Sequence, residues 1–154
     1  MPSPNAWEQS ARSRCGEAGY RMGPAREAII DLLAGQGCAL SAGEVQEAMR
    51  GAPRPVGRAS AFRILDQLEE LGLVRRLDLG DGMARYETID PSGDHHHHLV
   101  CDRCGRVVPF EDAELERSIR RVSSRMERFA VQTHDVTLRG ACGACCPPPD
   151  PAPR

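Results

Sequence analysis

A helix followed by a β-hairpin can be read directly from residues 57–89, GRASAFRILDQLEELGLVRRLDLGDGMARYETI. Between residues 58 and 71, apolar side chains recur at steps of three and four, which predicts a helix with one buried face. Residues 73–79 and 83–89 alternate apolar and polar side chains. Because Gly80-Asp81-Gly82 separates these two segments, they are predicted to pair as a hairpin.

Two more helices are predicted upstream of this unit. The first runs from about residue 22 to residue 35, with Pro24 at a position that suits a first helical turn. The second opens at Ser41, where Ser41 and Glu44 have the spacing of a capping box, and it ends before Pro53. Helix, turn, helix and hairpin in this order are typical of a winged helix-turn-helix. The alternative interpretation is a small α+β core without a nucleic-acid role.

The length and composition of the chain limit the classes of protein to which it can belong. The chain has 154 residues, 40% hydrophobic and 27% charged, which is typical of a soluble globular protein with one domain or two small ones. A membrane span is not expected, because no run of 18 apolar residues occurs. The N-terminal residues lack the basic and apolar segments of a signal peptide, which predicts a cytoplasmic protein with no membrane partner.

The charge balance does not by itself favour nucleic acid, because 20 basic and 22 acidic residues leave a net charge of −2. Every basic residue is an arginine, so each cationic contact comes from a guanidinium, which suits phosphate and guanine. Aromatic residues make up 4% of the chain, which disfavours stacking platforms for single-stranded nucleic acid.

A turn-rich segment, Asp90-Pro91-Ser92-Gly93-Asp94, divides the chain. We therefore predict a winged-helix domain over residues 1–89, a hinge linker over 90–94 and a small α/β domain over 95–146. A disordered Pro-rich tail is expected over 147–154. The predicted fold class is α+β.

The second domain is predicted to contain strands over residues 98–101, 106–110 and 129–138. Asp112 is the expected N-cap of a helix between the second and third of these strands. The apolar positions of this helix recur at steps of four, three and four, at Leu115, Ile119, Val122 and Met126.

Seven cysteines are present, and four of them form two C-x2-C pairs, Cys101 with Cys104 and Cys142 with Cys145. An odd number of cysteines in a chain with no predicted export signal disfavours a disulfide framework. Four thiolates in two such turns are typical of a closed tetrahedral zinc site. Since 37 residues separate the pairs, a strand–helix–strand unit is expected between them, with zinc holding its two ends together. Two redox C-x2-C motifs are the alternative.

Four consecutive histidines, residues 95–98, precede the first C-x2-C pair. In an extended segment successive side chains point to opposite sides. His96 and His98 are therefore expected to face one way, and His95 and His97 the other, so that one short run supplies two separate metal sites. A solvated His run with weak metal affinity is the alternative.

Three other residues are candidates to complete such sites. Glu87 ends the predicted hairpin, Glu116 lies on the flank of the predicted C-terminal helix, and His134 lies on the predicted final strand. Imidazole and carboxylate together suit zinc, ferrous iron or manganese.

The chain resembles the ferric uptake regulator (Fur) family of metal-responsive repressors over residues 19–145, nearly its whole length. The resemblance rests on Gly19-Tyr20-Arg21, on residues 57–65, on Arg85-Tyr86-Glu87 and on the run from His95 to Gly105. It implies an N-terminal winged helix and a C-terminal dimerisation domain. It also implies a homodimer that binds palindromic double-stranded operator DNA when metal is bound.

Matched residue by residue, the resemblance implies three metal sites and a DNA-contacting surface. The structural zinc ligands are Cys101, Cys104, Cys142 and Cys145. The regulatory hinge site takes Glu87, His96 and His98, and the additional site takes His95, His97, Glu116 and His134. The expected DNA contacts are Arg58, Ser60, Phe62 and Arg63, with Arg21, Arg75, Arg76 and Arg85 as phosphate contacts.

The sequence departs from the family pattern at four places. Ile89 and Asp90 stand where zinc-sensing members often have a cysteine, and Pro109 replaces an acidic residue that some members use. Ala39 and Leu40 stand where many members have a hinge histidine, so the fourth hinge ligand is open between Asp90 and Cys38. Phe62 stands where the family usually has tyrosine, and it is expected to pack on a thymine methyl group.

Zinc is the regulatory metal that we expect, because the His run is uninterrupted; ferrous iron is the alternative within the family. Peroxide sensing is disfavoured, since members with that role favour an aspartate at the hinge and this chain has Glu87. Outside the family, the alternative is a metal-buffering protein without DNA binding. No enzyme is expected and no residue is assigned a catalytic role, because no H-E-x-x-H helix or substrate pocket is evident.

Overall fold

A computed structural model describes residues 4–53, 55–90 and 95–144, and its mixture of helix and sheet confirms the α+β class. The chain divides into two compact units, Met1–Asp94 and His95–Arg154. The expected tail over 147–154 lies outside the described residues. Among the helices that the structure describes, none combines the length and the apolar character needed to cross a membrane.

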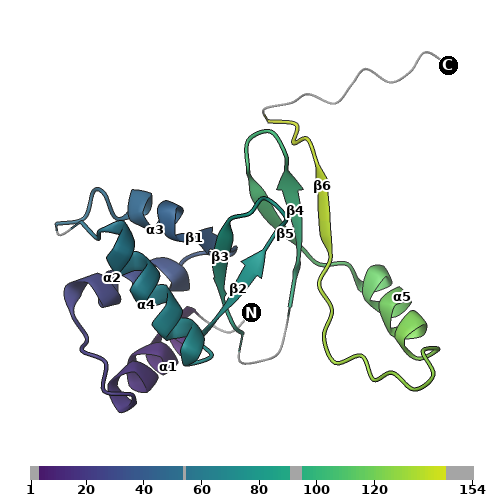
Figure 1. Cartoon of the computed structure of the whole chain (residues 1–154), viewed down its shortest axis with the longest axis horizontal. Helices are drawn as coiled ribbons and strands as arrows, with labels where there is room; N and C mark the ends of the chain where they lie inside the picture. Colours follow the sequence, from purple (N-terminus) through teal and green to yellow (C-terminus); the bar gives the residue numbers. More distant parts are fainter. Residues whose placement is uncertain (1–3, 54, 91–94, 145–154) are drawn as a thin grey trace. The chain divides into compact units, whose positions relative to one another are not determined.

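The first unit contains, in its described part, helices packed beside a three-stranded sheet (Figure 1). The helices are α1 (Pro4–Glu17), α2 (Pro24–Ala34), α3 (Ala42–Ala48) and α4 (Arg58–Glu70). The strands are β1 (Leu40–Ser41), β2 (Val74–Asp78) and β3 (Ala84–Thr88), in the antiparallel order β1-β3-β2. The predicted helices and the predicted hairpin are confirmed, whereas the two-residue strand β1 was not predicted.

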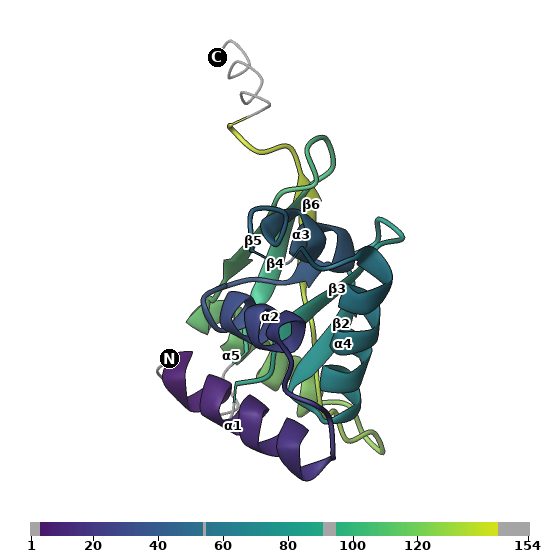
Figure 2. The same ribbon diagram turned by 90° about the vertical axis from the view of Figure 1, so that its left-hand side faces the viewer.

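One face of each helix builds the core of the first unit. Ile29 of α2, Val45 of α3 and Leu65 of α4 are fully buried in a single hydrophobic cluster. Helix α1 joins this cluster through Trp7, whose Nε1 donates a hydrogen bond to the carbonyl oxygen of Leu73 at 2.9 Å. Figure 2 shows α2 and α4 gathered with the hairpin strands and α1 running along one end of this group. The packing fixes α4 and leaves its outer face open to solvent.

The second unit has a small sheet and one described helix. Its strands are β4 (His97–Cys101), β5 (Val107–Phe110) and β6 (Thr137–Gly140), and its helix is α5 (Ala113–Ser123). Strand β4 lies in the middle, antiparallel to β5 and parallel to β6. A long connection leads from α5 back to β6 (Figure 1). The first predicted strand is thus extended by one residue to His97, and the second begins at Val107.

Two predictions for the second unit were wrong in extent. The final strand, expected over 129–138, is confined to Thr137–Gly140, because β4 offers it partners only from His98 to Cys101. Helix α5 ends at Ser123, so Met126 does not lie on its apolar stripe. After the helix, Arg128 adopts a φ of +64°, a left-handed conformation that turns the chain.

Candidate metal centres

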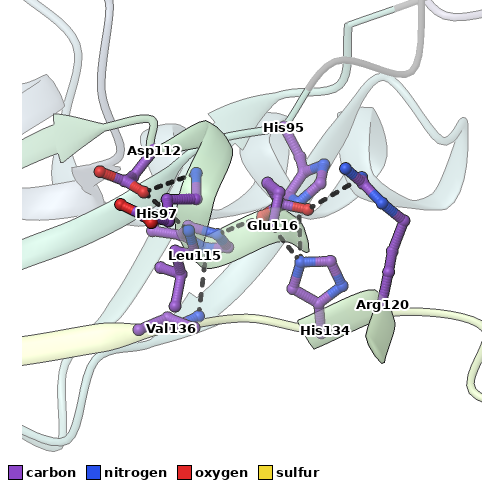
Figure 3. A network of polar contacts seen from close by, with 9 residues as sticks. His95, His97, Asp112, Leu115, Glu116, Arg120, His134 and Val136 are labelled. Carbon is purple, nitrogen blue, oxygen red and sulfur yellow. Dashed lines mark hydrogen bonds and ion pairs between the residues drawn. The ribbon is translucent and has the colours of Figure 1, made fainter. Parts of the chain in front are cut away.

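Three histidines and one glutamate of the second unit converge on a single point (Figure 3). Glu116 Oε1 lies 2.7 Å from His97 Nε2 and 3.0 Å from His134 Nε2. His95 Nε2 lies 3.1 Å from His134 Nε2 and 3.4 Å from Glu116 Oε1. The four donor atoms all fall within 4.8 Å of one another. The structure therefore brings together every residue predicted for the additional site.

The local structure explains why these side chains meet. Asp112 caps α5, its carboxylate accepting from the amides of Glu114 and Leu115, and Glu116 follows in the first turn of the helix. His97 opens β4 and is 2% exposed. The amide of Val136 donates to His97 Nδ1 at 3.3 Å, which leaves Nε2 directed at Glu116.

The electrostatics of this cluster favour a bound cation. Hydrogen bonds from His134 and then His97 lower the pKa of Glu116 to about 2, so its carboxylate is charged at neutral pH. Three imidazoles and one carboxylate form a donor set suited to zinc, ferrous iron or manganese. Each ring nitrogen must lose its proton to bind a metal, so loading of the cluster depends on pH.

Three cysteine sulfur atoms form a second cluster, at the end of the small sheet. Cys101, Cys104 and Cys142 have their sulfur atoms within 4.8 Å of one another, and Cys104 Sγ lies 3.6 Å from Cys142 Sγ. Tetrahedral zinc with Zn–S bonds of about 2.3 Å places its sulfur ligands about 3.8 Å apart. The cluster therefore fits a zinc ion. Cys145, the fourth predicted ligand, lies outside the described residues.

Backbone amides prepare one of these sulfur atoms for metal binding. Hydrogen bonds from the amides of Cys104, Cys142 and Arg103 lower the pKa of the Cys101 thiol to about 5. The thiolate is the form that binds metal. The parallel pairing of β4 with β6 brings Cys142 close to Cys101, since Cys101 is in register with Gly140. The predicted strand–helix–strand unit between the two pairs is confirmed.

The residues predicted for the hinge site are divided between the two units. Glu87 lies on β3 and is 3% exposed, and Asp90 follows that strand. His96 and His98 belong to the second unit, where their ring centroids are 5.0 Å apart. The predicted alternation along the His run is confirmed, because His95 and His97 serve the other cluster.

Helix α4 carries the four residues predicted to contact DNA through base edges. Arg58 and Arg63 are exposed, and Ser60 and Phe62 are half-buried. The Arg58 guanidinium lies over the Phe62 ring, 5.7 Å from its centroid, which gives a cation–π contact. The exposed phosphate candidates are Arg21 and Arg76.

Two other arginines have acidic partners that sequence reasoning missed. Arg85 is 3% exposed and its Nη1 lies 2.6 Å from Asp81 Oδ2, so its prediction as a phosphate contact was wrong. Arg75 forms an ion pair with Glu87 across the hairpin. The signal for the second pair is its register, because Arg75 lies directly opposite Glu87. The position and length of a hairpin turn fix which residues of its two strands lie opposite one another, so an exact assignment of the turn would have predicted this pair.

Comparison with known proteins agrees with this architecture. The model of the ferric uptake regulator family matches residues 17–139. The ferric uptake regulation protein of Bacillus subtilis is 34% identical over 128 residues, which cover 82% of this chain and 85% of that protein. That of Cupriavidus metallidurans is 40% identical over 104 residues, 67% of this chain and 70% of that protein. This chain belongs to the ferric uptake regulator family, whose members are metal-dependent transcription regulators.

A solved structure extends the agreement to the fold. The ferric uptake regulator of Helicobacter pylori, described as having three functional metal-binding sites, superimposes with a TM-score of 0.78 at 24% identity. The match covers 94% of this chain and 95% of that one. Other structural relatives are described with iron, with manganese or as zinc-bound. Structural and regulatory metals are thus consistent with the family, and the relatives include proteins with iron, manganese and zinc.

Proposed function

We propose that this protein is a homodimeric repressor that senses zinc and binds palindromic operator DNA when its regulatory site is loaded. The observation that carries the proposal is the presence of two kinds of metal cluster in one regulator. The cysteine cluster fits a structural zinc ion, and the cluster of His95, His97, Glu116 and His134 fits an additional ion that is separate from the hinge site proposed next.

The regulatory ion is proposed to bind at the hinge, to Glu87, His96 and His98, with Asp90 as the fourth ligand. Two features support this set. Glu87 is a buried carboxylate on the last strand of the first unit, and Asp90 follows it by three residues. His96 and His98 have adjacent rings and are not part of the other His cluster. Cys38 is the less favoured fourth ligand, because burial raises the pKa of its thiol.

The domain assignment follows from these sites. Residues 1–89 read DNA, residues 90–94 form the hinge, and residues 95–146 hold the structural zinc and the dimer interface. Cys145 completes the zinc site with Cys101, Cys104 and Cys142. A repressor of this kind acts where the DNA is, so we assign it to the cytoplasm.

The proposed mechanism couples the binding of metal to the binding of DNA. Glu87, His96 and His98 would hold the ion, which would link the winged helix to the dimerisation domain. This link favours the arrangement in which the two α4 helices of a dimer are spaced about one DNA turn, ~34 Å, apart. A metal drives this change only through its preference for that arrangement. A 100-fold gain in DNA affinity needs about 2.7 kcal/mol of coupling.

Zinc is favoured by the uninterrupted His run, and ferrous iron is the second candidate. Relatives named ferric uptake regulation proteins favour iron, with identities of 34% to 40%. Both ions accept imidazole and carboxylate ligands, so availability in the cell decides between them.

A gel-shift titration tests the metal choice directly. The zinc-containing dimer is titrated on its own promoter with Zn²⁺, Fe²⁺ and Mn²⁺ at buffered free concentrations. The proposal expects operator binding at the lowest free concentration with Zn²⁺. Binding at a concentration of Fe²⁺ within the cellular range, with no response to Zn²⁺, would identify an iron sensor instead.

Two ligand substitutions separate the regulatory and structural roles. His96→Ala is expected to abolish metal-dependent DNA binding and to leave a folded dimer. Cys101→Ser is expected to unfold the protein or to make it monomeric, because the binding energy of a structural zinc ion is folding energy. A Cys101→Ser protein that stays dimeric and metal-responsive contradicts this division of the sites.

The recognition surface is tested by removing two exposed guanidinium groups. Arg58→Ala combined with Arg63→Ala should eliminate operator binding at saturating metal, because both side chains face solvent on α4. Arg117→Ala, an exposed position on α5, is the matched control. Unchanged operator binding by the double variant would favour a metal-buffering protein.

A further inference from the structure

A buried carboxylate and a guanidinium face each other across the wing hairpin. Arg75 on β2 and Glu87 on β3 are directly opposite in the antiparallel register. Both Nε and Nη2 of Arg75 contact the same carboxylate oxygen, Glu87 Oε1. The Glu87 side chain is 3% exposed, whereas the Arg75 side chain is 31% exposed. The carboxylate is thus fixed inside, and its cationic partner reaches it from the surface.

The burial of Glu87 requires a positive charge nearby. An ionised carboxylate that is removed from water is stable in a protein only when it is paired with a cation and hydrogen-bonded. Arg75 meets both needs, because its planar guanidinium directs two N–H groups at the carboxylate. The ion pair therefore holds Glu87 charged in a protein without regulatory metal.

A divalent ion at Glu87 changes the charge balance around that carboxylate. The ion brings two positive charges to a group that already has one guanidinium, and like charges repel strongly in a partly buried site. Arg75 contacts one oxygen of this carboxylate through two N–H groups, so an ion that binds Glu87 is placed next to the guanidinium. The repulsion between the two cations therefore opposes their binding at the same time.

We propose that Arg75 is an internal competitor for the regulatory metal, which neutralises Glu87 in the metal-free protein and gives way when the ion binds. The inference rests on the proposed function, in which Glu87 is a hinge ligand. Arg75 then sets the metal concentration at which the repressor responds. Arg76, the next residue on β2, is opposite Tyr86 and has no such role.

The test measures metal affinity with the competing charge removed. Arg75→Gln keeps a hydrogen-bond donor for Glu87 but lacks the charge, and Arg76→Gln is the matched control. Both are made in the full chain with its structural zinc, in a Glu116→Ala background that disables the other His cluster. Affinities for Zn²⁺ and Mn²⁺ are measured by competition with a chromophoric chelator. Arg75→Gln is expected to bind about tenfold more tightly than the background, and Arg76→Gln to bind unchanged.

Thermal unfolding supplies a second readout. Without regulatory metal, Arg75→Gln and Arg75→Ala should unfold at lower temperature than the background, since a buried carboxylate loses its cation. Saturating Zn²⁺ should restore the background Tm, because the ion takes over that charge. If Arg75→Gln aggregates when metal-free, the gain in Tm on adding Zn²⁺ to Arg75→Ala decides the question.

A third variant separates failure of this inference from failure of the proposed function. Glu87→Gln should lose the Zn²⁺ and Mn²⁺ binding of the background. If it binds as the background does, Glu87 is not a ligand and the proposed hinge site is wrong. If Glu87→Gln loses binding while Arg75→Gln binds with equal or weaker affinity, the hinge site stands. In that case Arg75 only orients Glu87, and the competition is disproved.

Discussion

Among single residues, Tyr86 shows how one hydroxyl joins the hairpin strand β3 to helix α4. It is fully buried on β3, and its hydroxyl donates a hydrogen bond to Asp66 Oδ1 of α4 at 2.9 Å. Burial, followed by the contact with Asp66, raises the pKa of Tyr86 to about 12. The neutral phenol is thus the form that the folded protein stabilises.

We expect Tyr86→Phe to lower the free energy of unfolding by about 1.5–3 kcal/mol, because the hydrogen bond to a carboxyl group is lost. The pH dependence follows from the raised pKa. The stabilisation is complete below about pH 10, the ordinary tyrosine pKa, and is lost as the pH rises towards 12. Urea unfolding at pH 8 and at steps up to pH 11.5 measures both effects.

The control for this experiment is Tyr20→Phe. Its hydroxyl makes an exposed hydrogen bond to Glu70 at 3.3 Å, so its loss should cost much less at pH 8. Equal losses for the two variants would mean that the buried contact with Asp66 has no special weight. A Tyr86→Phe protein that loses stability above pH 10 as steeply as the wild type would contradict the assigned titration.

Individual contacts of the site also show what the sequence could and could not predict. The alternation of the His run and the two C-x2-C pairs could be predicted, because each depends only on local spacing. The pairing of Arg75 with Glu87 depends on which residues of two strands lie opposite one another, whereas the pairing of Arg85 with Asp81 depends on the conformation of the turn between them. A shift of one residue reverses the face of every side chain, so composition and pattern do not supply these contacts.

Among the helices and strands, α3 depends for its stability on the hydrogen bonds of its first turn. It has seven residues, and its N-cap Ser41 accepts a hydrogen bond from the Glu44 amide at 3.1 Å. Glu44 Oε2 in turn accepts from the Ser41 amide at 2.7 Å. So short a helix has little stability of its own, and this reciprocal pair satisfies amides that would otherwise lack a partner.

We expect Ser41→Ala to reduce the free energy of unfolding by about 1 kcal/mol, the usual cost of losing an N-cap side chain. Ser13→Ala is the matched control, because Ser13 lies inside α1 and its hydroxyl contacts Glu17 on the surface. Urea unfolding at neutral pH compares the two. A loss no larger for Ser41→Ala than for Ser13→Ala would show that packing alone holds α3.

The elements also show why some boundaries were predicted and others were not. Helices α2, α3 and α4 have start and stop signals in their own sequence, and their predicted limits agree with the structure within a few residues. The strand β6 has no such signal. Residues 129–136 were predicted to be extended, yet a strand exists only where a partner is available, and β4 provides one to Thr137–Gly140.

At the scale of the whole molecule, the two units bury apolar surface to different degrees. The hydrophobic cluster is drawn from side chains between Trp7 and Tyr86, all in the first unit. Helix α5, by contrast, buries none of its residues. Several large apolar side chains of the second unit are 37% to 70% exposed, namely Leu99, Val108, Val122, Met126, Phe129, Val131 and Leu138. So much exposed apolar surface on a small unit is typical of an interface between protein chains.

We therefore expect Val122→Asp to disrupt the proposed homodimer. Val122 is 52% exposed on α5, and a charge there would have to be buried without a partner when a second copy covers the helix. The dissociation constant of the dimer should rise at least 100-fold, equivalent to about 2.7 kcal/mol. Light scattering after size-exclusion chromatography, over a range of protein concentrations, reports the change in mass.

Met83→Asp is the control that separates this surface from exposed apolar residues in general. Met83 is 48% exposed at the tip of the wing hairpin, outside the second unit, and its substitution should leave the mass of the dimer unchanged. Metal-dependent DNA binding should fail in Val122→Asp, because a monomer presents one α4 to a two-fold operator. A monomeric Val122→Asp protein that still binds the operator with full affinity would break the link between dimerisation and repression. A Val122→Asp protein that stays dimeric would move the interface away from α5.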